Sequence, residues 1–201
     1  MKNVGMPFYI QRGLALMALI CLSPILGLTA LLIALESRGG VIFKQRRVGQ
    51  HGRQFDFIKF RSMRTPTDPK YREPRAEDSD RQGVCAKYLK DPRITTIGQF
   101  IRKFSIDELP QLWNVVKGDM ALVGPRPALV SEVEAYEQTD LDRLNAMPGL
   151  TGLWQVSGRA DTTFIEQVKL DLEYIERQSG WYDLLILFKT IPAVLTARGA
   201  Y

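Results

Sequence analysis

GLALMALICLSPILGLTALLIAL, residues 13–35, decides the fold, because no charged side chain interrupts it. The stretch exceeds the roughly 20 apolar residues that an α-helix needs to cross a bilayer. It is too long for the apolar core of a signal peptide, and no small-residue cleavage site follows it. A core helix of a soluble protein would rarely stay free of charge over this length. The stretch therefore predicts a helix that lies in a membrane.

Basic residues lie on both sides of this stretch. Lys2 and Arg12 precede it, and Arg38, Lys44, Arg46 and Arg47 follow it. Because Lys and Arg favour the cytoplasmic side of a membrane, a straight span cannot satisfy both ends. A re-entrant hairpin, which enters and leaves the membrane from the cytosol, can satisfy both.

The centre of the stretch supplies a bend at Ser23 and Pro24. Pro24 has no N–H, and its ring clashes with the carbonyl of Ile20 in a regular helix. Ser23 can bond a backbone carbonyl that the bend frees. Two interpretations stay open: a re-entrant helix hairpin over residues 1–38, broken at Ser23 and Pro24, and a kinked helix that spans the bilayer. Charge symmetry favours the hairpin.

The composition of the 201-residue chain, 45% hydrophobic and 24% charged, is typical of a globular domain. We expect one membrane-associated cytosolic domain over residues 39–201. The net charge of +5 suits a nucleic acid, a phosphate-bearing substrate or a membrane surface. Cys21 lies in the apolar stretch, which disfavours a disulfide framework, and the single histidine, His51, excludes a multi-His metal site. Carboxylates, Arg and Lys are left to carry any chemistry.

Secondary structure can be read in outline after residue 36. Residues 41–45 and 54–60 predict short strands, and residues 64–83, rich in Pro and charge, predict a long loop. Helical patterns follow, at residues 97–104, 109–116, 128–137 and 164–176. The apolar ending, residues 181–201, fits an interfacial helix that Pro192 would bend or end. We expect an α/β fold that is mostly helical with a small sheet, joined to the N-terminal membrane helix.

The segment IRKFSIDELPQLWNVVKGDMALVGPRP, residues 101–127, is the richest in chemistry. Asp107 and Glu108 stand at an expected helix start, with Pro110 in its first turn. The positive end of a helix keeps a carboxylate ionised and attracts phosphate, so Asp107 could attack a phosphorus atom while Glu108 holds a divalent cation. A structural alternative stays open, because Ser105 and Glu108 also read as a capping box.

Phosphate chemistry needs cations, and four are candidates for substrate-phosphate contacts: Lys59, Arg102, Arg126 and Arg159. Arg126 stands in the rigid Gly-Pro-Arg-Pro sequence of residues 124–127. The glycines of residues 148–152 and 157–159 form neither a P-loop nor a dinucleotide-binding fingerprint.

Several segments together resemble the monotopic phosphoglycosyl transferases, the bacterial sugar transferase family, in a small or catalytic-core form. They are the apolar stretch broken at Ser23-Pro24, and residues 43–63, 91–127 and 148–159, with the LDLEYIERQSGWYDLLILFKTI region near the end. The resemblance implies a re-entrant enzyme on the cytoplasmic face of the bacterial inner membrane. It starts surface glycans such as exopolysaccharide, lipopolysaccharide or capsule.

The resemblance also implies a two-step reaction with Asp107 as nucleophile and Glu108 as the Mg²⁺ ligand. Asp107 takes the sugar phosphate, expected to carry a hexose, from a UDP-sugar and releases UMP. Undecaprenyl phosphate then accepts the sugar phosphate. Two departures from the family pattern are Gly-Leu-Ala-Leu after Arg12, where members often carry Asp, and SRGGVIF, where a Gly-Pro is expected.

Two rival functions stay open. One is a Mg²⁺-dependent phosphatase or pyrophosphatase that acts on the same lipids. The other is a membrane-anchored glycan-assembly protein without catalysis, which would have no need for Asp107. We expect no nucleic-acid partner, because the chain carries no recognisable binding motif. A homo-oligomer is left open.

Overall fold

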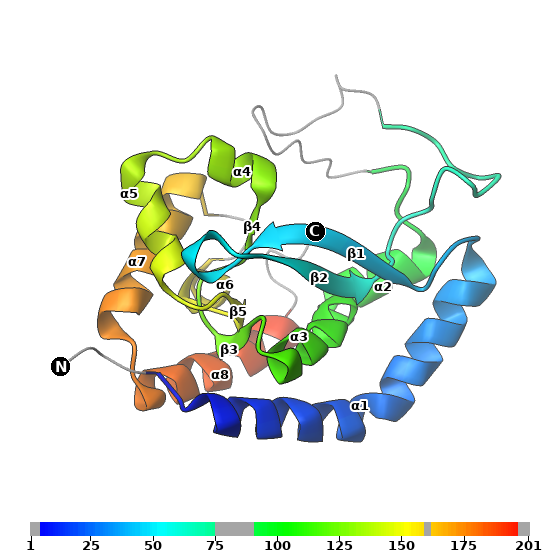
Figure 1. The fold of residues 1–201 in the computed structure, drawn as a ribbon. Coiled ribbons are helices and arrows are strands. Elements are labelled where there is room, and N and C mark those ends of the chain that lie inside the picture. Colours follow the sequence, from blue (N-terminus) through cyan, green and yellow to red (C-terminus); the bar gives the residue numbers. More distant parts are fainter. Residues whose placement is uncertain (1–4, 75–90, 159–161, 197–201) are drawn as a thin grey trace.

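The computed structural model describes residues 5–74, 91–158 and 162–196 (Figure 1). Helix α1, Phe8–Glu36, runs along one edge of the remaining fold and bends within its length (Figure 1). Pro24 lies inside it, and Ser23 Oγ donates a 2.8 Å hydrogen bond to the carbonyl of Ile20. That carbonyl is the one whose helical donor Pro24 lacks. The hydrogen bond therefore satisfies the acceptor that the bend would otherwise leave unpaired.

The start of α1 is hydrogen-bonded to the rest of the fold. Asp183 Oδ2, in helix α8 (Gly180–Leu195), accepts from the Met6 backbone N–H at 2.7 Å. Gln11 Nε2 donates to the Met6 carbonyl at 2.6 Å, and Gln11 Oε1 accepts from the Leu122 N–H at 2.7 Å. Because all of these groups are buried, the start of α1 has a fixed place against α8 and strand β3 (Ala121–Val123).

The end of α1 is fixed to the same fold. The Glu36 carboxylate accepts from the backbone N–H groups of Thr96 and Ile97, at 2.7 and 3.0 Å. These are the first residues of helix α2, Thr96–Lys103, so Glu36 supplies negative charge to a helix N-terminus. The buried Arg61 guanidinium also donates to the carbonyls of Ser37 and Gly40, at 2.9 and 2.6 Å. Both ends of α1 are therefore tied to one domain.

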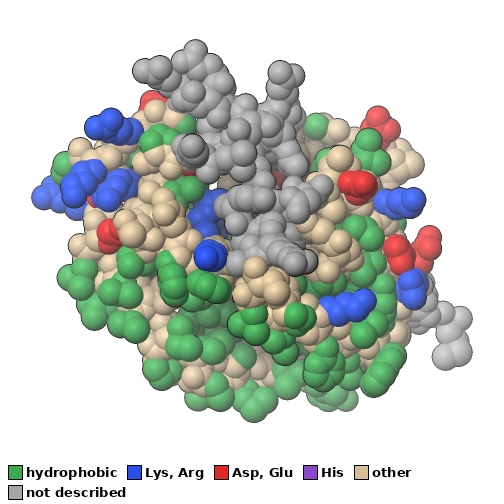
Figure 2. Space-filling model, turned by 180° about the vertical axis from the view of Figure 1, so that it is seen from behind, with side chains coloured by type: hydrophobic (Ala, Val, Ile, Leu, Met, Phe, Trp, Pro, Cys, Tyr) green, Lys and Arg blue, Asp and Glu red, His purple; other side chains and the backbone are tan. Residues whose placement is uncertain are grey.

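One stripe of α1 packs on the domain and the rest is exposed. Gln11, Ala15, Thr29 and Ile33 are buried, while large apolar side chains on the other faces are exposed. Helix α8 likewise exposes Trp181, Phe188, Ile191 and Leu195. Figure 2 shows hydrophobic side chains gathered along the edge that α1 and α8 form in Figure 1. Within the described residues, α1 is the one helix long and apolar enough to cross a membrane.

The small sheet is built on a hairpin. Strands β1, Ile42–Val48, and β2, Gln54–Phe60, pair antiparallel through the turn η1, Gln50–Gly52. Strand β2 has the predicted bounds, and β1 begins one residue later than expected and ends three residues later. Strand β4, Ala128–Leu129, pairs with the end of β1, and β3 pairs in parallel with β5, Gly149–Thr151. Phe55 and Phe57 lie on the hairpin face that packs into the core.

The predicted helices are present with one exception. Residues 128–137, predicted to be helical, begin instead with β4, because Ala128 and Leu129 pair with Val48 and Arg47. The helical parts of the described chain after α2 are η3 (Ile106–Gln111), α3 (Leu112–Lys117), α4 (Val130–Glu134), α5 (Gln138–Leu141), η4 (Asp142–Asn145), α6 (Leu153–Ser157), α7 (Phe164–Arg177) and α8. Pro192 lies inside α8, which continues to Leu195. The expectation of a mostly helical fold with a small sheet is confirmed.

Candidate active site

Asp107 and Glu108 lie in the first turn of the 3-10 helix η3. The residue before this helix, Ser105, adopts a left-handed conformation with φ 53° and ψ 24°, which is unusual for a residue other than glycine. Its side chain makes no capping hydrogen bond, so the capping-box alternative for Ser105 and Glu108 is wrong. The strained turn redirects the chain so that Asp107 is 7% exposed.

Asp107 belongs to a cluster of opposite charges. Burial, reinforced by the neighbouring Glu108 carboxylate, raises the pKa of Asp107 to about 7, while Lys59 and Arg102 oppose the rise. Burial also lowers the pKa of Lys59, and the positive charges of Arg102 and Arg126 lower it further, whereas Asp107 and Glu108 counteract them. The structure thus brings four of the predicted site residues, Asp107, Glu108, Arg102 and Arg126, within electrostatic reach of a fifth, Lys59. The sixth, Arg159, lies outside the described residues.

Two separate elements, strand β2 and helix α2, position Lys59 and Arg102. Lys59 lies on β2 opposite Phe43 of β1, and its Nζ stands 5.5 Å from the centre of the Phe43 ring. This contact with an aromatic face favours the charged ammonium despite its burial. Arg102 is in the last turn of α2, the helix whose N-terminus is capped by Glu36 at the end of α1 and by Thr95.

The turn that carries Arg126, residues 124–127, is held along its backbone. The Gly124 N–H donates to the Thr151 carbonyl at 2.9 Å, and the Pro125 carbonyl accepts from the Gly149 N–H at 2.8 Å. A Cβ at position 149 would overlap the backbone of Gly124, so glycine permits this close approach. The turn therefore presents Arg126 from a rigid frame.

A buried arginine, Arg47, holds the far end of the same turn. Its Nη1 donates to the Pro127 carbonyl at 3.1 Å, and its Nε and Nη2 donate to Gln45 Oε1 at 3.1 and 2.8 Å. The guanidinium also lies 5.2 Å from the centre of the Phe57 ring. Our sequence analysis used Arg47 only as part of the basic flank of the membrane helix. Its burial depends on β4 pairing beside it, which the local sequence did not reveal.

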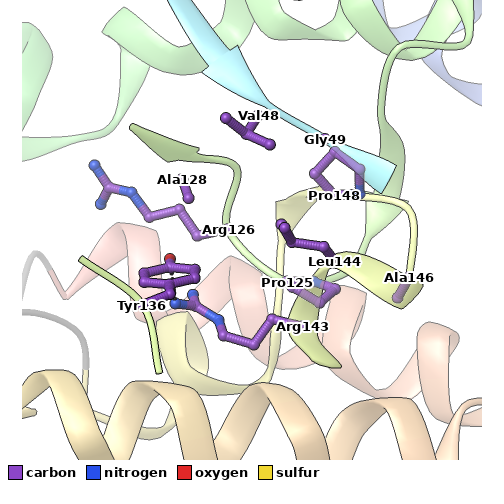
Figure 3. A pocket seen from close by; sticks show the side chains of 10 residues that line it. All are labelled: Val48, Gly49, Pro125, Arg126, Ala128, Tyr136, Arg143, Leu144, Ala146 and Pro148. Carbon is purple, nitrogen blue, oxygen red and sulfur yellow. Dashed lines mark hydrogen bonds between the residues drawn. The ribbon is translucent and has the colours of Figure 1, made fainter. Parts of the chain in front are cut away.

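A buried ion pair supports the turn from the other side. Arg143 donates to Asp171 Oδ2 through Nε and Nη2, at 2.9 and 2.6 Å, and to the Tyr136 hydroxyl at 2.8 Å. Burial raises the pKa of Asp171 to about 6, against the opposing charges of Arg143 and Arg126. Arg126, Tyr136 and Arg143 line a cavity of about 10 Å³, room for about one water molecule (Figure 3). Sequence reasoning missed Arg143 and Asp171 as well.

We expect Asp171→Asn to destabilise the protein strongly at pH 8. The substitution leaves the Arg143 guanidinium buried without its counter-charge, which typically costs about 3–5 kcal/mol and lowers the melting temperature by roughly 10 °C. Thermal unfolding in detergent measures this. Glu173→Gln is the matched control on the same helix, because Glu173 pairs with Arg177 on the exposed surface. Equal melting temperatures for the two variants would contradict a structural role for the buried pair.

The carboxylates of Asp107 and Glu108 suit a Mg²⁺ ion that takes its remaining ligands from water and substrate phosphate. They do not suit an ion that is coordinated by protein side chains alone. No group of three or more His, Cys, Asp or Glu side chains suited to a metal occurs in residues 5–74, 91–158 and 162–196. Mg²⁺ is commonly bound by one or two carboxylates and completed by water and substrate phosphates. Asp107 and Glu108 can supply that pair of carboxylates beside the positive charges of Lys59 and Arg102.

Comparison with known proteins places this chain in a family. The family profile for the bacterial sugar transferases matches residues 8–197. The exopolysaccharide production protein ExoY of Sinorhizobium fredii is 42% identical over 193 residues, which cover 94% of this chain and 84% of that protein. The undecaprenyl-phosphate galactose phosphotransferase of Salmonella typhimurium is 48% identical over 167 residues, which cover 81% of this chain. The undecaprenyl-phosphate glucose phosphotransferase of Komagataeibacter xylinus is 40% identical over 202 residues.

The coverage differs among these relatives. The chain spans most of ExoY but only 35% of each of the two named phosphotransferases. Since the family match covers nearly the whole described chain, the resemblance expected from the sequence is confirmed: this chain belongs to the bacterial sugar transferase family and is a phosphoglycosyl transferase.

Proposed function

We propose that the protein transfers a hexose-1-phosphate from a UDP-sugar to undecaprenyl phosphate and thereby starts a surface glycan. The observation that carries the proposal is a buried carboxylate, Asp107, within electrostatic reach of Glu108, Lys59 and Arg102. Such a site can activate a nucleophile and neutralise a diphosphate at the same place. The names of the galactose and glucose phosphotransferases among the relatives support the lipid acceptor and a hexose.

In the first step, an ionised Asp107 oxygen attacks the phosphorus that carries the sugar. A bond forms between that oxygen and the phosphorus, the bond from the phosphorus to the bridging oxygen breaks, and UMP leaves with the bridging oxygen. Lys59, Arg102 and Arg126 stabilise the charge on the phosphate oxygens as it shifts to the leaving group. Mg²⁺ held by Glu108 with Asp107 would supply further neutralisation of the diphosphate.

In the second step, a phosphate oxygen of undecaprenyl phosphate attacks the same phosphorus. The bond from Asp107 to phosphorus breaks, the carboxylate is regenerated, and the sugar leaves on a lipid diphosphate. Splitting the transfer in this way lets a soluble donor and a lipid acceptor use one set of cations in turn.

The test uses purified protein with Mg²⁺, undecaprenyl phosphate and a panel of UDP-hexoses, and it scores UMP and lipid-linked sugar separately. We expect one donor to yield both products in equal amounts. Inorganic phosphate released from undecaprenyl phosphate, without UMP or a lipid-linked sugar, would instead favour the phosphatase alternative. A folded protein that forms neither product with any donor would contradict the proposed function.

We also propose that residues 1–38 form a re-entrant element and that residues 39–201 form the catalytic domain on the cytoplasmic face of the inner membrane. A straight helix of 29 residues would be about 43 Å long, and one that spans the bilayer has its ends on opposite sides. In this protein both ends of α1 are hydrogen-bonded to the same domain, through Asp183 at the start and Glu36 at the end. The bend within α1, the presence of Pro24 inside it and the basic flanks support the same placement.

We expect cysteines at both flanks of α1 to be protected from the periplasm. After Cys21 and Cys85 are replaced by Ser, single cysteines at Asn3 and Lys44 should react with a membrane-impermeant maleimide in lysed but not in intact spheroplasts. An engineered periplasmic cysteine on another protein is the control for reagent access. Labelling of the Asn3→Cys variant alone in intact spheroplasts would show that α1 spans the membrane.

A further inference from the structure

The second half of helix α1, residues 25–36, packs against the three elements that carry the charged cluster around Asp107. Its Ile33 is buried in a small hydrophobic core with side chains of β2, α2 and η3, namely Phe60, Ile101 and Ile106. Each of these three residues is next in sequence to a member of the cluster: Lys59, Arg102 and Asp107, respectively. The end of the membrane helix therefore contacts the frame on which the cluster is built.

Glu36, the last residue of α1, holds the N-terminus of α2, which lies beside this half of α1 (Figure 1). Its carboxylate accepts from the first two N–H groups of α2, those of Thr96 and Ile97, and Thr95 Oγ1 accepts from the third, that of Gly98, at 2.8 Å. Burial alone would raise the pKa of Glu36, but hydrogen bonds with Thr95 and with the two N–H groups lower it overall. An ionised carboxylate of α1 thus sets where α2 begins.

The start of α2 also contacts the segment that follows β2. The Thr95 N–H donates to the carbonyl of Ser62 at 3.2 Å. A Cβ at position 98 would overlap the same carbonyl oxygen, so Gly98 permits this close approach. Strand β2 ends at Phe60 and carries Lys59. The end of α1, the start of α2 and the chain just beyond Lys59 therefore meet in one place.

Helix α2 connects this place with the nucleophile. It has eight residues and is about 12 Å long, with Arg102 in its last turn. The carbonyl of Arg102 accepts from the Ser105 N–H at 3.1 Å, and the carbonyl of Ser105 accepts from the Glu108 N–H at 3.2 Å. Ser105 is the left-handed residue that turns the chain towards Asp107. Because a short helix moves as a rigid element, a displacement at its start reaches Arg102 and this turn.

We propose that Glu36 is a positioning residue for the transfer reaction. By fixing the start of α2 it places Arg102 relative to Asp107, and it acts through the helix rather than on the substrate. The activity then depends on how the membrane helix is seated, because its last residue determines where α2 lies. This assignment rests on the proposed function, since it gives Glu36 a part in that reaction.

The test compares Glu36→Gln with wild type in steady-state UMP release by the full chain in detergent. The substitution keeps the size of the side chain, removes its charge and replaces one acceptor oxygen by an amide that cannot accept. We expect kcat to fall about tenfold while KM for the donor stays within about twofold, because a misplaced group slows the chemical step. Asp183→Asn is the matched control, since Asp183 binds a backbone N–H at the other end of α1. It should keep the wild-type kcat, even where its melting temperature is lower.

Two further measurements keep the assignment open to contradiction. Glu36→Asp keeps the charge and shortens the side chain, so its kcat should fall less, by about threefold. Hydrogen exchange of the Thr96 and Ile97 amides should be faster in Glu36→Gln than in wild type and unchanged in Asp183→Asn.

A wild-type kcat in Glu36→Gln, or in Glu36→Asp if the first variant does not fold, would overturn the positioning role. An equal loss of kcat in Asp183→Asn would also overturn it, because the loss would then follow from general destabilisation. A wild type that releases no UMP from any UDP-sugar would instead overturn the proposed function, and the exchange of the two amides would still show whether Glu36 fixes α2.

Discussion

Asp107→Asn should reduce the rate of UMP release by at least about 10³-fold, because an amide cannot act as the nucleophile that forms the phosphoryl intermediate. The substitution keeps the size of the side chain. It also removes a carboxylate whose ionisation is disfavoured by burial and by Glu108. We therefore expect a melting temperature no lower than that of the wild type, so that the loss of activity cannot be attributed to unfolding. UMP release and thermal unfolding measure the two quantities.

A second measurement concerns the covalent intermediate directly. Wild-type protein given a UDP-sugar labelled in the sugar, without lipid acceptor, should retain label in a hydroxylamine-sensitive form, whereas Asp107→Asn should retain none. Asp56→Asn is the matched control, since Asp56 lies on β2 in an exposed ion pair with Arg46. Wild-type UMP release or labelling by Asp107→Asn would remove the covalent mechanism.

Features encoded in a short stretch could be predicted from the sequence. The apolar run at residues 13–35 predicted a long helix, and the alternating Phe55 and Phe57 predicted a strand with the bounds that β2 has. Local patterns failed where pairing decides the structure. Ala128 and Leu129 look helical by composition, but they form a strand because β1 offers them an edge.

The residues of the candidate site also divide into those that the sequence predicted and those that it did not. Asp107, Glu108, Lys59, Arg102 and Arg126 were predicted because acidic and basic residues of these types suit phosphate chemistry and because their segments resemble a family. The residues that hold Arg126 in place, Arg47, Arg143 and Asp171, were not predicted. Their importance comes from burial, which long-range packing produces: Arg143 and Asp171 are 28 positions apart, and Arg47 and Pro127 are 80 apart.

The left-handed turn at Ser105 is a further feature that the sequence did not reveal. The segment from Ser105 to Glu108 satisfies the residue pattern of a capping box, and an N-cap residue would have extended backbone angles. The observed φ of 53° instead turns the chain sharply before η3 and buries Asp107. A pattern that normally predicts a stable helix start is here part of a strained segment that positions Asp107.

The second large effect concerns Lys59. Lys59→Met should lower UMP release at pH 7 by about 10²–10³-fold, because it removes a half-buried positive charge that acts on Asp107. It should also change how the rate depends on pH, since Lys59 opposes the rise in the pKa of Asp107. Lys44→Met is the matched control, because Lys44 is exposed on the other face of the same hairpin.

The direction of the pH effect follows from the two pKa values. Asp107 attacks only when ionised, so a pKa of about 7 predicts that kcat/KM for the donor falls up to tenfold per pH unit below pH 7. Lys59 acts only when protonated, and its lowered pKa predicts a second fall in kcat/KM on the alkaline side.

In Lys59→Met the acid limb of the pH profile should move to higher pH and the alkaline limb should disappear, so that activity recovers in part as the pH rises to 9. A variant that keeps the bell-shaped wild-type profile at reduced height would show that Lys59 is not the group that titrates with Asp107. The cluster would then owe its balance of charge to Arg102, which also lowers the pKa of Asp107.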